Sequence, residues 1–142
     1  MGLAMRRPLD FLLPLLTPRT VFMDIAPADC ALALRAASYV ERVWCVEPPE
    51  KLLRAPCNLR WAGLGGVPVK SVDVAFSESL KKPHDVRELL APGGVYFVYG
   101  PLLPAQLFRE AGYSHVRYYA GNVRVPAALA RISRSTTTAA YK

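Results

Sequence analysis

Two carboxylates, Asp24 and Glu47, stand near the ends of two short apolar runs, where each could bind a polar ligand. The first run, "VFM", leads into Asp24 and then into a turn-like "APAD"; the second, "RVWCV", ends directly before Glu47. An acid that ends an apolar strand, about twenty residues after a strand–turn–helix, is well placed to accept hydrogen bonds from both hydroxyls of a ribose. This spacing favours Glu47 as a ribose ligand over an ordinary surface acid at a strand end.

A catalytic acid or base is harder to assign. The titratable side chains near the same strand ends are His84, Asp85 and Tyr99, with His115 farther along the chain. His84 is the candidate base, because it opens a predicted helix close to the end of a predicted strand at 71–77. A partly exposed histidine at a helix start is the commoner explanation, so the catalytic residue stays unassigned.

Composition predicts one globular domain and gives no sign of a metal site. The chain has 142 residues, of which 52% are hydrophobic and 20% charged. Its cysteines, Cys30, Cys45 and Cys57, are odd in number and lack CxxC spacing, so neither a zinc site nor a disulfide framework is expected. No apolar stretch approaches the ~20 residues that cross a bilayer, and the Arg6-Arg7 pair is only faintly like an export signal. We expect a cytoplasmic protein with no membrane partner.

Positive charge gathers toward the C-terminus. The net charge is +7, and no acid follows Glu110, whereas five basic residues do: Arg117, Arg124, Arg131, Arg134 and Lys142. Such a segment could attract an anionic substrate or a phosphate backbone. The basic residues are spaced along the chain without an evident aromatic platform, so a solvated basic face is favoured and a nucleic-acid partner is not expected.

Strand-like and helix-like segments alternate along the chain, a pattern typical of an α/β fold with a mainly parallel sheet. A short helical piece, "KLLRA", is also expected at 51–55. The predicted strands lie at about 20–25, 42–47, 58–63, 71–77 and 95–101, and the predicted helices at about 29–39, 84–94 and 104–112.

The C-terminal part departs from this alternation. "SHVRYYAG" and "VRVPAALARIS" follow each other with no room for a helix, which predicts an antiparallel hairpin. The expected fold is therefore α/β: a Rossmann-like, mainly parallel twisted sheet with flanking helices and a C-terminal antiparallel hairpin. We expect an N-terminal arm at 1–18, one α/β domain at 19–134 and a C-terminal tail at 135–142.

Taken in order, these segments resemble the class I S-adenosylmethionine-dependent methyltransferases, over about residues 18–134. The segments that carry the resemblance are "VFMDIAPADCALALRAA", "VERVWCVEP", "VPVKSVDVAFSESL", "VRELLAPGGVYFVYGP" and "FREAGYSHVRYY". The resemblance implies S-adenosylmethionine (SAM) as the cofactor. It implies cofactor-binding positions at Asp24, Ala26, Ala28, Glu47, Leu64 and Ser77.

Some of these positions depart from the family pattern. Ala26, Ala28 and Cys30 stand where the family has glycines, and Leu64 stands where it has a third acid. Three hypotheses follow. The chain is a small methyltransferase acting on a small-molecule acceptor, its pocket completed by a second copy or by a protein partner. Alternatively, it is an inactive methyltransferase-like domain that acts as a binding or scaffold protein, or a domain for another nucleotide.

Overall fold

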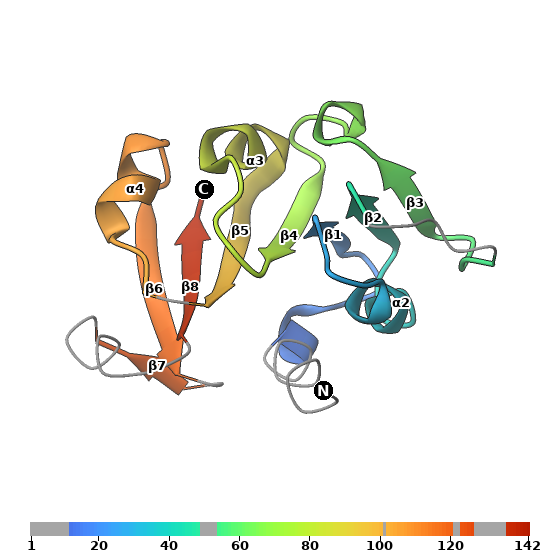
Figure 1. The fold of residues 1–142 in the computed structure, drawn as a ribbon, viewed down its shortest axis with the longest axis horizontal. Helices are drawn as coiled ribbons and strands as arrows, with labels where there is room; N and C mark the ends of the chain where they lie inside the picture. Colours follow the sequence, from blue (N-terminus) through green and yellow to red (C-terminus); the bar gives the residue numbers. More distant parts are fainter. Residues whose placement is uncertain (1–11, 49–53, 101, 121–122, 127–135) are drawn as a thin grey trace.

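In the part of the chain that the computed structural model describes, a mixed sheet of eight strands forms the centre of the molecule (Figure 1). The structure describes residues 12–48, 54–100, 102–120, 123–126 and 136–142. The strands in sheet order are β3 (Leu59–Ala62), β2 (Arg42–Val46), β1 (Val21–Ile25), β4 (Val72–Ser77), β5 (Leu90–Gly100), β8 (Thr136–Tyr141), β6 (His115–Ala120) and β7 (Val123–Val125).

The parallel half of the sheet follows directly from the apolar runs. β3, β2, β1, β4 and β5 pair in parallel, with Phe22 of β1 beside Val43 on one side and Val74 on the other. Strands that are covered on both faces need apolar side chains on both faces, so they are continuous apolar runs rather than alternating ones. In β1, every residue after Val21 is buried.

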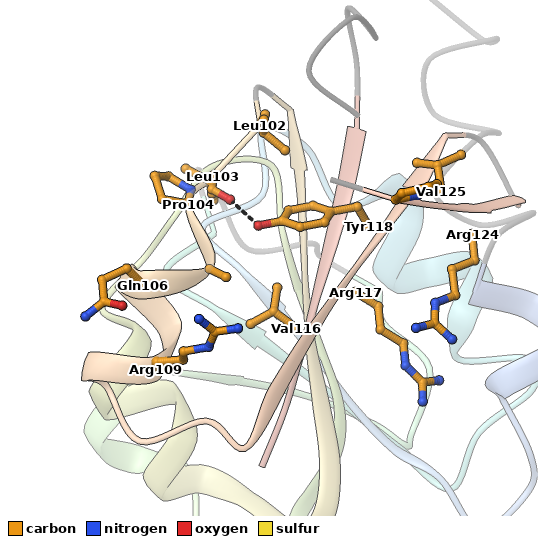
Figure 2. A pocket seen from close by; sticks show the side chains of 12 residues that line it. Leu102, Leu103, Pro104, Gln106, Arg109, Val116, Arg117, Tyr118, Arg124 and Val125 are labelled. Carbon is orange, nitrogen blue, oxygen red and sulfur yellow. Dashed lines mark hydrogen bonds between the residues drawn. The ribbon is translucent and has the colours of Figure 1, made fainter. Parts of the chain in front are cut away.

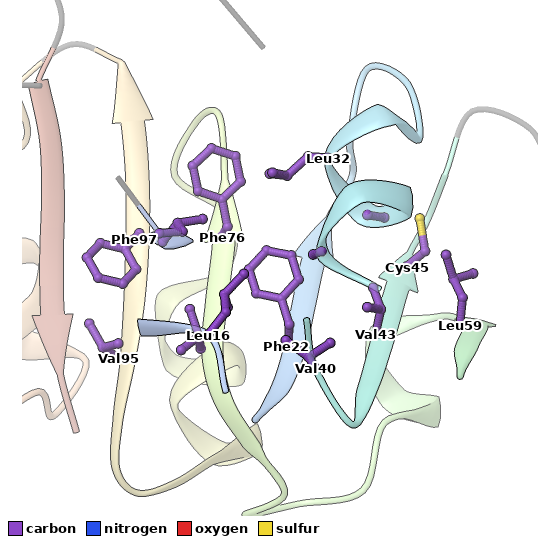
Figure 3. Close-up of a cluster of buried hydrophobic side chains, with 14 of the residues drawn as sticks. Leu16, Phe22, Leu32, Val40, Val43, Cys45, Leu59, Phe76, Val95 and Phe97 are labelled. Carbon is purple, nitrogen blue, oxygen red and sulfur yellow. The ribbon is translucent and has the colours of Figure 1, made fainter. Parts of the chain in front are cut away.

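Short helices cover the two faces of the sheet, and each face has its own apolar cluster. The helices in the described residues are η1 (Leu13–Leu15), α2 (Ala31–Ala36), η2 (Leu64–Gly66), α3 (Pro83–Leu89) and α4 (Ala105–Glu110). The cluster shown in Figure 3 joins residues of the η1 segment and α2 to Phe22, Phe76 and Phe97 of the sheet. The opposite cluster joins α3 and α4 to Met23 and Tyr96. None of the helices in the described part of the chain is long and apolar enough to cross a bilayer.

The "APGG" segment corrects a predicted boundary. The sequence predicts a helix over 84–94 and a strand over 95–101, but α3 ends at Leu89 and β5 begins at Leu90. Pro92 and Gly93 then form a bulge, where the β4–β5 register shifts between Val72 and Val74. Proline supplies no N–H for the ladder and Gly93 has φ +80°, so the segment leaves the ladder locally without ending the strand.

The C-terminal segment corrects a second expectation. The predicted hairpin is present as the antiparallel pair β6–β7. However, β8 inserts antiparallel between β5 and β6, so residues 136–141 of the expected tail lie in the middle of the sheet. Threonine is β-branched and suits a strand, and Thr136 to Thr138 are buried in this interior strand. Much of "VRVPAALARIS" lies outside the described residues, as does most of the expected helix at 51–55.

The expected N-terminal arm also reaches the core. Leu12 is fully buried and Leu16 is buried in the cluster of Figure 3, so the sheet domain extends at least to residue 12. The predicted fold class is confirmed: a mainly parallel sheet, helices on both faces and antiparallel strands toward the C-terminus.

We predict that Gly94→Ala destabilises the fold and that Gly63→Ala does not. A Cβ at Gly94 would lie 2.9 Å from the Ala91 carbonyl oxygen and 3.0 Å from that of Val72, and both are backbone atoms that cannot move aside easily. Overpacking of this kind costs about 1–3 kcal/mol. A Cβ at Gly63 meets nothing within 4 Å. Urea unfolding of both variants measures the difference; equal stability of the two would contradict the tight bulge.

Candidate functional site

The predicted cofactor residues lie along one edge of the sheet, where the parallel strands end. Within the sheet, β2 and β3 lie on one side of β1, whereas β4 and β5 lie on its other side. Ligands of open α/β sheets bind at such a reversal of strand order, beyond the carboxyl ends of the strands. Asp24, Glu47 and Ser77 lie at the ends of β1, β2 and β4, and Leu64 follows β3 closely.

The turn that leaves β1 keeps a glycine-like backbone without glycine. Ala26 has φ +46°, in the left-handed region, and its N–H donates to the Val46 carbonyl at 2.7 Å. Holding an alanine in this region costs about 1–2 kcal/mol. Ala28, two residues later, is exposed. The left-handed turn therefore forms at position 26 even though the residue there is alanine.

Glu47 repeats this geometry at the end of β2. Its φ is +51°, and its N–H donates to the Ala62 carbonyl at 3.1 Å. The residue is exposed, and its carboxylate accepts no hydrogen bond from any residue that the structure describes. The side chain is thus free to accept hydrogen bonds from a ligand at this edge.

Asp24 is the buried polar group of the site. It is 2% exposed, and its Oδ2 has no hydrogen-bond partner among the described residues. Burial raises the pKa of the carboxyl to about 8, with smaller contributions from the negative charges of Glu78 and Asp29. The neighbouring cavity measures only about 10 Å³ and is lined by Asp24, Pro27, Ala28, Asp29, Leu32, Phe76 and Glu78. That volume holds about one water molecule.

Ser77 and Leu64 lie on the same edge but outside this cavity. The Ser77 hydroxyl lies 2.6 Å from the Tyr96 hydroxyl and donates to the Ser79 carbonyl at 2.6 Å, so it holds the loop after β4 in place. Leu64 lines a separate cavity of about 300 Å³, together with Lys82 and Asp85. Of the six predicted cofactor positions, Asp24 and Ala28 line one common cavity.

His84 lies on the surface of α3. Its side chain is 70% exposed, and Nε2 is 3.8 Å from the Glu88 carboxylate one turn along the helix. It does not line the cavity beside Asp24. The catalytic role of His84 stays a prediction, and its position fits a surface ion pair. The described residues also contain no group of three or more His, Cys, Asp or Glu side chains placed to hold a metal.

A larger cavity of about 860 Å³ lies elsewhere, with α4 on one side and β6 and β7 on the other (Figure 2). Arg109, Val116 and Tyr118 are among its lining residues, and the Tyr118 hydroxyl donates to the Leu103 carbonyl at 2.8 Å. Four strand spacings of about 4.8 Å separate β1 from β6, roughly 19 Å in all. No sequence pattern pointed to this cavity, because its lining comes from three separate segments.

Other residues that line the cavity beside Asp24, among them Asp29 and Phe76, are not among the six predicted cofactor positions. The sequence pattern places Asp29 only in a turn; its Oδ1 accepts the Ala31 N–H at 2.9 Å and so helps to begin α2. The pattern of an acid one residue before the helix cap could have pointed to it.

We predict that, as the pH rises, the free energy of unfolding of the wild type falls relative to that of the Asp24→Asn variant. The pKa of Asp24 is higher in the folded chain than its ordinary value of 3.8, so the folded state holds the proton more tightly. The resulting stabilisation is complete below the ordinary pKa and is lost as pH rises to about 8, by at most about 1.4 kcal/mol per pH unit. Urea unfolding across this range measures the difference.

Asp85→Asn, on the exposed surface of α3, is the control for that experiment and should follow the wild type. A difference between wild type and Asp24→Asn that stays constant with pH would mean that Asp24 is ionised in the folded chain.

Comparison with known proteins supports the architecture. No protein-family model and no curated protein sequence matches the chain. Among solved structures, a Burkholderia thailandensis 1,6-didemethyltoxoflavin-N1-methyltransferase with bound S-adenosylhomocysteine (SAH) is similar, with a TM-score of 0.67 and 15% identity over 98% of this chain and 78% of that one. A tRNA (m1A58) methyltransferase from Aquifex aeolicus gives a TM-score of 0.65 and 13% identity over 97% and 68%.

A SAM-dependent O-methyltransferase from Thermotoga maritima is also similar, with a TM-score of 0.64 and 13% identity over 96% of this chain and 64% of that one. The strand order of this chain and its similarity to these structures agree. The chain therefore has the fold of the class I SAM-dependent methyltransferases.

Proposed function

We propose that the chain is a SAM-dependent methyltransferase that acts on a small-molecule acceptor. The observation that carries the proposal is the pair of left-handed residues, Ala26 and Glu47, on adjacent strand ends. Left-handed backbone at residues other than glycine persists where the surrounding structure requires it, and it concentrates at ligand sites. Here it lies at the edge where ligands of this fold class bind.

The residues present fit the ribose end of SAM well. The Glu47 carboxylate is exposed and accepts no hydrogen bond from the described chain, and a carboxylate can accept from two hydroxyls at once. We assign Glu47 to the ribose.

The methionine end fits in charge but needs more room. Asp29 and Glu78 place negative charge beside Asp24, and the unpartnered Oδ2 of Asp24 would accept a hydrogen bond from an ammonium group. The present cavity of about 10 Å³ is too small for that group. Binding therefore requires the turn at 26–29 to move outward, and this turn includes the exposed residues Ala28 and Asp29.

When bound, SAM supplies a methyl group on a positively charged sulfur, and transfer depends mainly on alignment with the acceptor. In this proposal Glu47 orients the cofactor and Asp24 balances its charge. We do not assign the cavity of Figure 2 to the acceptor, because it lies mainly between α4 and strands β6 and β7, and β6 is four strands from β1; only its lining at 102–104 follows β5. The acceptor would instead approach the ends of β4 and β5, where a second copy or a protein partner completes the pocket.

A second candidate is a methyltransferase-like scaffold that binds no cofactor. The small cavity beside Asp24 favours it, because the Ala28 and Pro27 side chains already line the space that the methionine end would need. The two candidates differ in a single measurable property, the affinity for SAM and SAH. A domain that binds another nucleotide would respond to neither compound.

We predict micromolar binding of SAM and SAH by calorimetric titration, weakened at least about tenfold by Glu47→Ala. Hydrogen bonds to a charged group contribute about 1.5–3 kcal/mol each, which sets this lower limit. Glu41→Ala is the matched control, because Glu41 is an exposed glutamate just before β2, at the opposite edge of the sheet. It should bind like the wild type.

Absence of both heat and thermal stabilisation at millimolar SAM and SAH would support the scaffold candidate. Binding that is unaffected by Glu47→Ala would leave the fold unchanged but remove Glu47 from the site.

A further inference from the structure

Aromatic and basic side chains lie together on one face of the sheet, in the part formed by β5, β8, β6 and β7. We call this group the aromatic–basic face; it comprises Tyr99, His115, Arg117, Tyr119, Arg124 and Tyr141. The strand register places them together. One row across the sheet runs from Tyr99 on β5 through Thr137 on β8 to Tyr119 on β6 and Arg124 on β7.

The next rows on the same face complete the group. Arg117 lies beside Ala139 of β8, and His115 lies beside Tyr141. Because side chains two residues apart on a strand share a face, His115, Arg117 and Tyr119 all project to the same side. Figure 2 shows the Arg117 and Arg124 side chains extending next to each other, and both residues also line the cavity drawn there.

The aromatic side chains are held in place by their neighbours and stay partly exposed. The His115 ring stacks on Tyr141 with centroids 4.7 Å apart and an angle of 13° between the rings. The Arg117 guanidinium lies 5.2 Å from the centre of the same tyrosine ring. Tyr99, Tyr119 and Tyr141 pack against the apolar cluster yet stay only half-buried. Their positions are therefore set by the sheet.

The charged side chains that the described parts of β5, β6, β7 and β8 contribute to this face are basic. No Asp or Glu occurs after Glu110 in the sequence, so β6, β7 and β8 contribute no carboxylate. Arg124 and His115 are exposed and Arg117 is half-buried. The helix α4 packs on β6 from the other side, where Phe108 and Val116 belong to the opposite cluster.

We propose that the aromatic–basic face binds single-stranded nucleic acid. Unpaired bases stack on tyrosine and histidine rings and on guanidinium planes, while arginines neutralise phosphates. Tyr99 and Tyr119 are two strand spacings apart, about 10 Å, so separate bases can reach them. Double-stranded nucleic acid fits less well, because its bases are paired and stacked and cannot stack on the aromatic rings. An acidic protein also fits less well, because it would contact the arginines but would leave the aromatic rings without a role.

This proposal reverses the expectation drawn from spacing along the chain. The basic and aromatic residues are dispersed in sequence because they come from separate strands, and the antiparallel insertion of β8 brings them side by side. The proposal does not depend on SAM binding, since the face is formed by β5, β8, β6 and β7 and excludes Asp24 and Glu47.

The test is fluorescence anisotropy with a short fluorescein-labelled oligouridine, and an oligothymidine to distinguish RNA from DNA. Tyr119→Leu should weaken binding at least about fivefold because it removes a stacking ring, whereas Tyr119→Phe keeps the ring and should bind like the wild type. The double variant Arg117→Gln/Arg124→Gln should lower the slope of log affinity against log salt by about 1.4, or about 0.7 for each phosphate that an arginine no longer neutralises.

Arg60→Gln is the matched control, because this exposed arginine lies on β3, at the opposite end of the strand order from β6 and β7. Thermal melts verify that each variant is folded. Failure of the wild type to bind either oligonucleotide would overturn the proposal. An equal loss of affinity in Arg60→Gln would also overturn it. Displacement of the oligonucleotide by polyglutamate, together with an unchanged affinity in Tyr119→Leu, would mean that the face binds polyanions or acidic proteins by charge alone, and would overturn it as well.

Discussion

Two backbone hydrogen bonds beyond the ends of β1 and β2 set the shape of the candidate site. The Ala26 N–H donates to Val46 and the Glu47 N–H donates to Ala62, so each bond continues the ladder one step past the strand. Both donors have a left-handed backbone at that point. This constraint turns the chain away from the sheet at the same level on neighbouring strands, and it leaves Asp24 buried behind the first turn and Glu47 exposed beyond the second.

The burial of Asp24 connects the fold to the site. A carboxyl group without a partner for Oδ2 in the described chain, and with a pKa of about 8, is more easily buried as the neutral acid. A cation bound beside it would favour the ionised form and so would be bound more tightly. The small cavity opposes this binding, because the turn at 26–29 must move before such a cation can enter, and that movement costs free energy. The balance between these two effects decides between an enzyme and a scaffold.

Much of the architecture could be predicted from the sequence because buried parallel strands are continuous apolar runs with turns between them. Asp24 and Glu47 were found at the edge for the same reason. β8 was missed because a run of threonines is not apolar, and its partners are set by register with β5 and β6 rather than by local pattern. The small size of the Asp24 cavity reflects side chains such as Leu32 and Phe76, which come from separate elements, and spacing along the chain does not reveal that they meet there.

The most direct measurement is a titration of ¹⁵N-labelled protein with SAH, followed by the chemical shifts of assigned backbone amides. If the left-handed turns form the cofactor site, the shifts of Ala26, Ala28 and Glu47 change together and saturate at one affinity. The amides of α4 and β6, on the far side of β5, stay unchanged. The account would be contradicted if saturating SAH left the chemical shifts of the Ala26 and Glu47 amides unchanged. It would also be contradicted if SAH changed only the shifts of amides around the cavity of Figure 2.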